Sequence, residues 1–364
     1  MDKFEIVKFL KSAVVSHASD EHLKVGYPPY IRKNGFIKKI SMDILTKEDM
    51  EFAIQEIAPV ELKDKILTKT DFDFMYEIPG CSRFRINYNR QLGNPSLVIR
   101  NIPYNIPNLS ELALPEILNS VINYQNGIVL VTGPTGSGKS TTLASLINQI
   151  SLHTAKHIVT IEDPVEYVFN STKSIISQRL VGVDTETFSE GIKYALRQDP
   201  DVIFIGEIRD RDTMEAALKA AETGHLVFST LHTNDAVQTI NRIVNMFEEA
   251  NRFMIRKQLS ETLRATIAQK LIYSNANDKR YPACEIMVVT PTIKDYIRKD
   301  NLDEIYALLA SNNIDDMVSM NMSLLHLFNL GKISEEEALE ASNDANELEK
   351  MFKGVYQGTV NYYE

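Results

Sequence analysis

A phosphate-binding motif occupies residues 133–140, which read Gly-Pro-Thr-Gly-Ser-Gly-Lys-Ser. The stretch satisfies the P-loop pattern G-x-x-x-x-G-K-[ST] in full. The apolar residues 128–131 before it predict a buried strand, and residues 141–150 after it predict a helix. A glycine-rich turn in that position lets backbone N–H groups wrap a phosphate chain at the positive end of a helix. A Gly/Ser loop that matches by chance is the alternative, and it explains neither flanking element. We therefore predict that the chain binds a nucleoside triphosphate.

The motif also predicts a role for individual residues. The Lys139 ammonium would reach the outer phosphates, and the Ser140 hydroxyl would ligate Mg²⁺. The predicted nucleotide-binding residues are Gly133, Pro134, Thr135, Gly136, Ser137, Gly138, Lys139, Ser140 and Thr141.

Acidic residues follow a second predicted strand, at 157–162. In an open parallel sheet, ligands bind beyond the carboxyl ends of the strands. Glu162 and Asp163 stand at that end, where carboxylates can hold Mg²⁺ or its waters. A solvated turn before Pro164 is the alternative. We predict metal ligation by Ser140, Glu162 and Asp163, and a catalytic role for Glu162.

A third predicted strand, at 201–206, ends in Gly206-Glu207. The second motif of nucleotide hydrolases is an apolar strand that ends in Asp, and here Gly206 stands in place of that Asp. Glu207 remains at the strand end, where it could orient a water against the γ-phosphate. We predict that Glu207 is the catalytic carboxylate.

Histidine and arginine side chains complete the candidates. His232 follows a strand predicted at 225–230 and could sense the γ-phosphate, whereas His225 lies at the other end of that strand. A guanidinium can stabilise charge on a transferred phosphoryl group. A single arginine or histidine is more often structural. The candidate arginines are Arg85, Arg100, Arg197 and Arg209.

Composition sets the class of protein. The chain has 364 residues, enough for two domains, and a net charge of −10, which disfavours nucleic acid as the main partner. Its two cysteines, Cys81 and Cys284, form neither a disulfide framework nor a metal knuckle, which fits a reducing compartment. Mixed charges at the amino terminus do not read as a secretory signal, and no apolar run is long enough to span a membrane.

The pattern of elements divides the chain. Residues 1–102 read as a small α+β domain, with a strand pair turned at Asn34-Gly35. The proline-spaced residues 103–114 read as a linker. Residues 115–290 alternate strand and helix, which predicts an α/β domain with a parallel sheet, and residues 291–364 read as helices only. The helices of the α/β part are expected at 139–150, 187–197, 211–222 and 250–264.

Together these motifs resemble the secretion ATPases of type II secretion and type IV pili. The shared segments are the P-loop, Thr160–Glu166, Asp199–Asp210 with its Gly206, and Gly224–Asp235. Segments outside these motifs, among them Ser82–Asn87 and Glu335–Leu339, are similar to the pilus retraction ATPases, the PilT family. Residues 292–299 align with a carboxyl-terminal motif of that family, although its first Ala and last Glu are replaced.

The resemblance implies more than the residues show by themselves. It implies a PAS-like amino-terminal domain, a RecA-like P-loop domain with a helical carboxyl-terminal subdomain, and a cytoplasmic homohexamer that hydrolyses ATP with Mg²⁺ to retract type IV pili in twitching motility. Arg85 and Arg100 match arginines that contact the nucleotide. The expected partner is an inner-membrane pilus platform protein, through which alone the chain would associate with the cytoplasmic face of the membrane.

Three alternatives remain open. An extension or type II secretion ATPase of the same superfamily usually carries a longer amino-terminal part and a four-cysteine zinc insert, which this chain lacks. A nucleic-acid translocase or recombinase is disfavoured by the acidic balance. A regulatory module that binds nucleotide without turnover is disfavoured by the intact Lys139 and Glu207.

Overall fold

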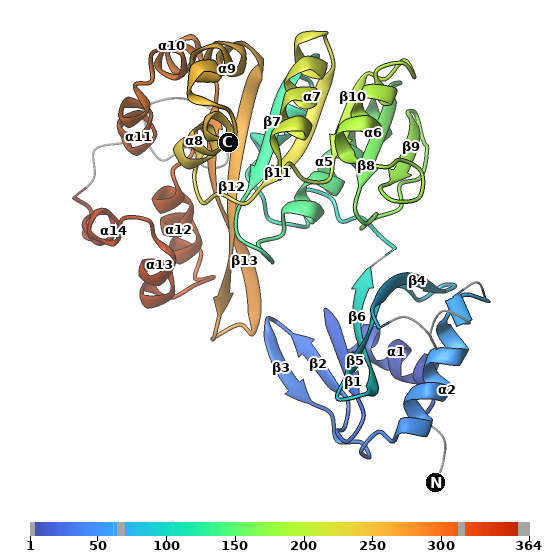
Figure 1. The fold of residues 1–364 in the computed structure, drawn as a ribbon. Helices are drawn as coiled ribbons and strands as arrows, with labels where there is room; N and C mark the ends of the chain where they lie inside the picture. The colour runs from blue at the N-terminus through green and yellow to red at the C-terminus, as the bar shows by residue number, and fades with distance from the viewer. Residues whose placement is uncertain (1–3, 61, 64–69, 103, 312–316, 356–364) are drawn as a thin grey trace. The chain divides into compact units, whose positions relative to one another are not determined.

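The protein folds into two compact units, Met1–Asn105 and Ile106–Glu364. The computed structural model describes residues 4–60, 62–63, 70–102, 104–311 and 317–355 (Figure 1). The expected domain boundaries at 102, 114 and 290 stay predictions.

The first unit is an antiparallel sheet with helices. Its strands run in the order β3-β2-β1-β6-β5-β4. They are β1 (Asp20–Lys24), β2 (Tyr30–Lys33), β3 (Phe36–Lys39), β4 (Phe72–Ile78), β5 (Ser82–Gln91) and β6 (Asn94–Ile102). The helices include α1 (Ile6–Val15) and α2 (Lys47–Ile57). Asn34 and Gly35 have φ of 53° and 91° and turn β2 into β3, as predicted.

The sheet of the first unit has one apolar and one polar face. Along the first eight residues of β5, buried side chains alternate with partly exposed ones. The buried side chains join residues of α1 and α2 in one core, which includes Leu10, Ile54, Phe84 and Ile99. The opposite face is therefore left to polar groups, because successive strand residues point to opposite sides.

The second unit is built on a seven-stranded sheet of order β13-β12-β7-β11-β10-β8-β9. Its strands are β7 (Gly127–Thr132), β8 (His157–Glu162), β9 (Ile175–Leu180), β10 (Val202–Ile205), β11 (Leu226–Leu231), β12 (Leu263–Ser274) and β13 (Lys279–Val288). All neighbours pair in parallel except β12 and β13, which are antiparallel. The sheet is therefore mixed, and the purely parallel sheet that the sequence predicted is corrected at this edge.

Helices cover both faces of this sheet (Figure 1). One core contains residues of α5 (Lys139–His153), α12 (Met320–Asn329), α13 (Glu335–Ala341) and α14 (Ala345–Phe352). The other contains residues of α6 (Phe188–Ala195), α7 (Arg211–Glu222), α8 (Ala236–Asn245), α9 (Glu249–Thr262), α10 (Pro291–Lys299) and α11 (Leu302–Ser311). The short α4 (Leu118–Val121) precedes β7. Val129 and Val131 of β7 face the first core and Ile128 and Leu130 the second, so the central strand is buried on both sides.

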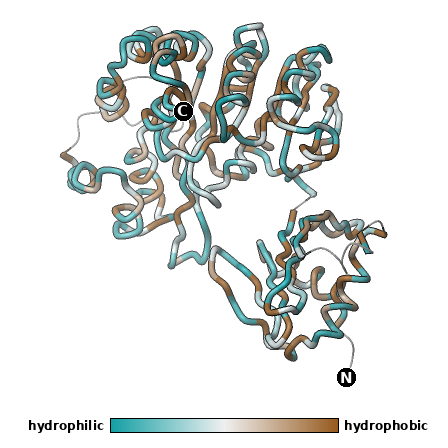
Figure 2. The backbone as a smooth tube through the Cα atoms, viewed as in Figure 1, coloured by the Kyte–Doolittle hydropathy of each residue, from teal (hydrophilic) through white to brown (hydrophobic). Residues whose placement is uncertain are grey.

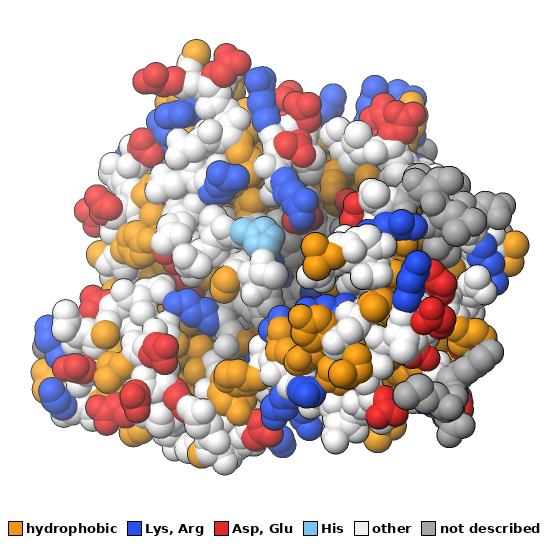
Figure 3. All heavy atoms as spheres, turned by 60° about the horizontal axis from the view of Figure 1, so that its bottom comes forward, with side chains coloured by type: hydrophobic (Ala, Val, Ile, Leu, Met, Phe, Trp, Pro, Cys, Tyr) orange, Lys and Arg blue, Asp and Glu red, His pale blue; other side chains and the backbone are white. Residues whose placement is uncertain are grey.

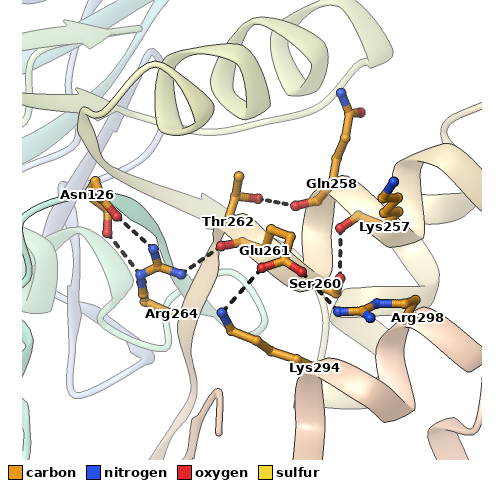
Figure 4. Close-up of polar contacts among 9 residues, drawn as sticks. All are labelled: Asn126, Lys257, Gln258, Ser260, Glu261, Thr262, Arg264, Lys294 and Arg298. Atoms are coloured by element: carbon orange, nitrogen blue, oxygen red, sulfur yellow. Dashed lines mark hydrogen bonds and ion pairs between the residues drawn. The ribbon is translucent and has the colours of Figure 1, made fainter. Parts of the chain in front are cut away.

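The helix predicted at 250–264 ends two residues early, where β12 begins. Arg264 fixes this junction, since its guanidinium donates to the backbone oxygen and the Oδ1 of Asn126, at 3.1 and 2.7 Å, and to the Glu261 carbonyl at 2.8 Å (Figure 4). The Glu261 carboxylate also binds Arg298 at 2.9 Å and Lys294 at 3.5 Å. These contacts hold α9, α10 and the start of β7 together.

No helix in the described parts of the chain is long and apolar enough to cross a membrane. Figure 2 shows hydrophilic and hydrophobic residues interspersed along the helices, as expected for helices that bury one side only.

Candidate functional site

The P-loop leaves the sheet at the carboxyl end of its central strand. All six residues of β7 are buried, and its last residue, Thr132, lies opposite Leu231 of β11 and Ala268 of β12. The adjacent strands β11, β10 and β8 run parallel to β7. Residues that follow these four strands therefore gather at one edge, as the sequence predicted.

Two glycines of the loop lie where a Cβ atom would meet neighbouring atoms. Gly133 has φ of 141° and Gly138 has φ of 90°, both in the region that side chains disfavour. A Cβ atom on Gly133 would collide with the carbonyl oxygen of Gln269 and lie 2.6 Å from the Ser137 hydroxyl. On Gly138 it would lie 2.7 Å from Nε2 of Gln269. The loop is thus shaped by close backbone approach, which is what a phosphate cradle requires.

Lys139 is folded into the loop. Its Nζ donates to the carbonyl oxygens of Gly133 and Pro134, both at 2.9 Å, and the residue is 8% exposed. Burial lowers the pKa of Lys139, while the carboxylates of Glu166 and Glu207 oppose that change. Lys139 therefore brings a positive charge to the loop, with two acids close enough to influence it.

Two polar groups at the loop are buried without a hydrogen-bond partner among the described residues. They are the hydroxyls of Thr132 and Ser137. Buried polar groups are usually paired, so unpaired ones beside a phosphate cradle suit an additional ligand. The Thr141 hydroxyl, by contrast, shares a hydrogen bond of 3.0 Å with the Tyr167 hydroxyl, and Ser140 is partly buried at the start of α5.

Glu207 and His232 lie together, although they follow different strands. One Glu207 oxygen binds Arg209 at 2.6 Å, and the other lies 3.6 Å from Nε2 of His232. The Glu207 side chain is 14% exposed and that of His232 is 48% exposed. His225, at the opposite end of β11, instead contacts the Ala220 carbonyl at 3.0 Å. Of the two histidines, only His232 stands beside a candidate catalytic group.

Glu162 is buried and engaged by its own surroundings. One oxygen accepts from Thr160 at 2.6 Å and from Gln178 at 3.2 Å, and the other accepts from the Glu166 amide at 3.4 Å. Burial raises the pKa of Glu162 to about 7, although the hydrogen bonds lower it. Asp163 is exposed. Glu162 thus anchors the loop after β8, while Asp163 is open to solvent.

The oxygen donors at this edge fit Mg²⁺. This ion takes oxygen ligands, and in phosphate sites it usually combines one or two protein carboxylates with substrate phosphates and waters. Ser140 lies at the start of α5, Glu162 ends β8 and Asp163 follows it, so each offers an oxygen atom of the kind that Mg²⁺ takes. Their sharing of one ion stays a prediction. No three His, Cys, Asp or Glu side chains cluster as a metal site within the described residues.

Arg85 and Arg100 lie side by side in the first unit. They face each other across the β5–β6 ladder, and each is matched by an acid. Nε of Arg100 lies 3.0 Å from Asp20, and Nη2 of Arg85 lies 3.7 Å from Asp73. The structure therefore pairs the two arginines on the polar face of the antiparallel sheet, and their contact with nucleotide stays a prediction.

Gln269 contacts the P-loop and was not predicted from the sequence. Gln269 of β12 is 3% exposed and contacts the P-loop through both its side chain and its backbone. The available signal was weak, because Gln269 stands in a mostly apolar segment, residues 265–272, that also contains Thr266 and Lys270. Such a residue needs partners, but the sequence does not say which.

Known proteins are similar to this chain over most of its length. The family described as Type II/IV secretion system protein matches residues 6–290. The type IV pilus retraction ATPase PilT of Pseudomonas aeruginosa is 40% identical over 336 residues, which cover 92% of this chain and 97% of that protein. A twitching motility protein of Neisseria gonorrhoeae is 36% identical over 345 residues, 95% of this chain and 92% of that protein. A crystal structure of the pilus retraction motor PilT with bound ADP superposes with a TM-score of 0.86 at 40% identity, covering 96% of this chain and all of that one.

Proposed function

The chain belongs to the type II/IV secretion system protein family of ATPases, and we propose that it is the motor that retracts type IV pili by hydrolysing ATP. The observation that carries the proposal is the strand-end constellation of Lys139, Glu207 and His232. It occurs in a chain that matches a pilus retraction ATPase over nearly the full length of both proteins.

We assign each side chain of the site a step in ATP hydrolysis. The P-loop amides and Lys139 bind the phosphates, and Lys139 exchanges its two carbonyl contacts for phosphate oxygens. Glu207 orients the water that attacks the γ-phosphate and accepts its proton, so that ADP and phosphate are the products. His232 lies beside Glu207 and would contact the γ-phosphate when ATP is bound, so that it senses whether this phosphate is present. Bound Mg²⁺, held through Ser140 and the acids Glu162 and Asp163, would neutralise charge on the phosphates.

The fold supports a division into moving parts. In this proposal, the antiparallel first unit is the PAS-like domain. The unit that contains the P-loop is the RecA-like domain, and α10 to α14 form its helical subdomain. Arg85 and Arg100 would reach the nucleotide when domains or neighbouring subunits close on ATP. Loss of the γ-phosphate would release them, which converts hydrolysis into movement. A homohexameric ring is the assembly we propose.

The partner we propose is an inner-membrane platform protein of the pilus. The chain would work on the cytoplasmic face of that membrane and associate with it only through this partner. A nucleic-acid partner is not expected: the net charge is −10, and the face drawn in Figure 3 intersperses Lys and Arg with Asp and Glu side chains.

The test replaces the native gene of the source cell by variants and follows single pili by fluorescence microscopy. With the wild-type chain, pili extend and retract, and with Lys139→Ala they extend but do not retract. The matched control is Lys219→Ala, which changes an exposed residue in the last turn of α7, and pili should retract normally with it. Loss of extension rather than retraction would assign the chain to the extension or secretion branch. DNA-stimulated hydrolysis by the purified chain would favour the translocase alternative.

A further inference from the structure

Gln269 stands directly beside the start of the P-loop. Strand β12 pairs in parallel with β7 up to Ala268, which lies opposite Thr132, the last residue of β7. The residue after Ala268 is Gln269, and the residue after Thr132 is Gly133, so these two residues are neighbours across the two strands. Close approach of their backbones explains why no Cβ fits on Gly133. Strand β12 thus continues alongside the loop after β7 has ended.

The Gln269 side chain joins two parts of the phosphate site. Its Nε2 donates to the carbonyl oxygen of Ser137 at 2.8 Å, and its Oε1 accepts from the Thr142 hydroxyl at 2.7 Å. Ser137 lies within the loop, and Thr142 lies in the first turn of α5. Both ends of the amide are used, and all three residues are buried. Gln269 is thus a bridge between the loop and the helix that follows it.

The bridge sets the direction of an amide in the loop. In a trans peptide the C=O and N–H groups point in opposite directions because the unit is planar. The Ser137 carbonyl points at Gln269, so the N–H of Gly138, which belongs to the same peptide unit, points away from Gln269. A P-loop binds phosphate through such N–H groups. By holding the Ser137 carbonyl, Gln269 therefore also holds the Gly138 N–H toward the phosphate-binding side of the loop.

We propose that Gln269 is a positioning residue of the ATP site, which orients the Gly138 amide toward phosphate and keeps the loop in register with α5. The proposal rests on ATP binding at the P-loop. A purely structural role, in which Gln269 only packs β12 against α5, would lower stability without changing the affinity of the folded protein for nucleotide.

The test uses two substitutions in the full chain. Gln269→Met keeps the length of the side chain and removes both hydrogen bonds. Gln269→Glu keeps the acceptor for Thr142 but sets a carboxylate against the Ser137 carbonyl. Gln149→Met is the matched control, because Gln149 lies on α5, the helix that Gln269 contacts, and donates an exposed hydrogen bond of 3.3 Å to Asn108. ADP affinity is measured by calorimetry, kcat and KM for ATP by phosphate release, and folding by circular dichroism.

We expect Kd for ADP and KM for ATP to rise about tenfold in Gln269→Met, which corresponds to the loss of one hydrogen bond, from the Gly138 amide to phosphate, worth about 1.4 kcal/mol. The rise should be at least as large in Gln269→Glu, and kcat should fall less than KM rises. Gln149→Met should match the wild type. If Gln269→Met does not fold, Gln269→Glu and Thr142→Val, which removes only the helix side of the bridge, decide the matter.

Wild-type Kd and KM in folded Gln269 variants, even with a lower melting temperature, would overturn the positioning role. A wild-type chain that neither binds ADP nor hydrolyses ATP would instead refute the proposed function. The two failures are therefore distinguishable in the same set of measurements.

Discussion

Replacing Glu207 by glutamine separates nucleotide binding from hydrolysis at the strand-end site. Glutamine keeps the shape of the side chain and one oxygen, but it loses the charge and the ability to take a proton. In the structure that charge faces His232 at 3.6 Å and acts on Lys139. Removing it leaves the P-loop contacts in place, so nucleotide binding should be kept.

The expected effects on rate and on stability differ in size. A positioned acid–base group contributes about 10²- to 10⁴-fold to a rate, so kcat should fall by that factor, or about 3 to 5 kcal/mol in the barrier. Stability should change little, because the ion pair with Arg209 involves a guanidinium side chain that is 72% exposed and is worth at most about 1 kcal/mol. ADP affinity should not weaken, since one negative charge has left the neighbourhood of the phosphates.

The assay combines steady-state ATP turnover with calorimetric ADP binding. The matched control is Glu215→Gln on α7, which removes a carboxylate whose side chain is 65% exposed and whose ion pair with Arg211 spans 4.0 Å. It should leave both quantities unchanged. The reasoning is wrong if Glu207→Gln turns over ATP at a near-normal rate. If Glu162→Gln then binds ATP without hydrolysing it, the two glutamates have exchanged roles.

Three further predictions concern other groups. Lys139→Ala should abolish turnover and weaken ADP binding in calorimetry, because the phosphates lose their positive partner; normal turnover would contradict the P-loop assignment. In Arg100→Ala the rate of ATP hydrolysis should fall by up to about 10³-fold. Mixing this variant with Lys139→Ala chains should restore activity if the arginine acts across subunits. Normal activity of Arg100→Ala alone would show that Arg100 is not part of the site. Burial raises the pKa of Glu21 to about 8 from 4.5, so the folded state holds this proton more tightly and the free energy of unfolding should decrease as pH rises through that window. Glu21→Gln should flatten the fall in melting temperature between about pH 5 and pH 8, and an unchanged slope would show that Glu21 is not the group responsible.

The sequence alone determined the parts of the site that are local in the chain. Residues 133–140 set the turn, because the glycines, Lys139 and Ser140 act within one loop and the helix that it starts. Glu207 and His232 could be placed at one edge because parallel strands end on the same side. The alternation of strand and helix was enough to predict the parallel sheet. The 3.6 Å contact between the Glu207 and His232 side chains agrees with their expected place at one edge of it.

The tertiary structure decided what depends on residues far apart in the chain. Gln269 meets Ser137 across 132 positions, and Arg100 meets Asp20 across 80, and no spacing rule relates such pairs. The helix predicted to reach residue 264 ends at Thr262 because the segment that follows pairs with β7, and its apolar residues would suit either state until that partner is present. The polar bridge behind the P-loop exists only because β12 is packed there. A buried glutamine is stable only where the fold supplies both a donor and an acceptor, and that match is a property of the assembled core.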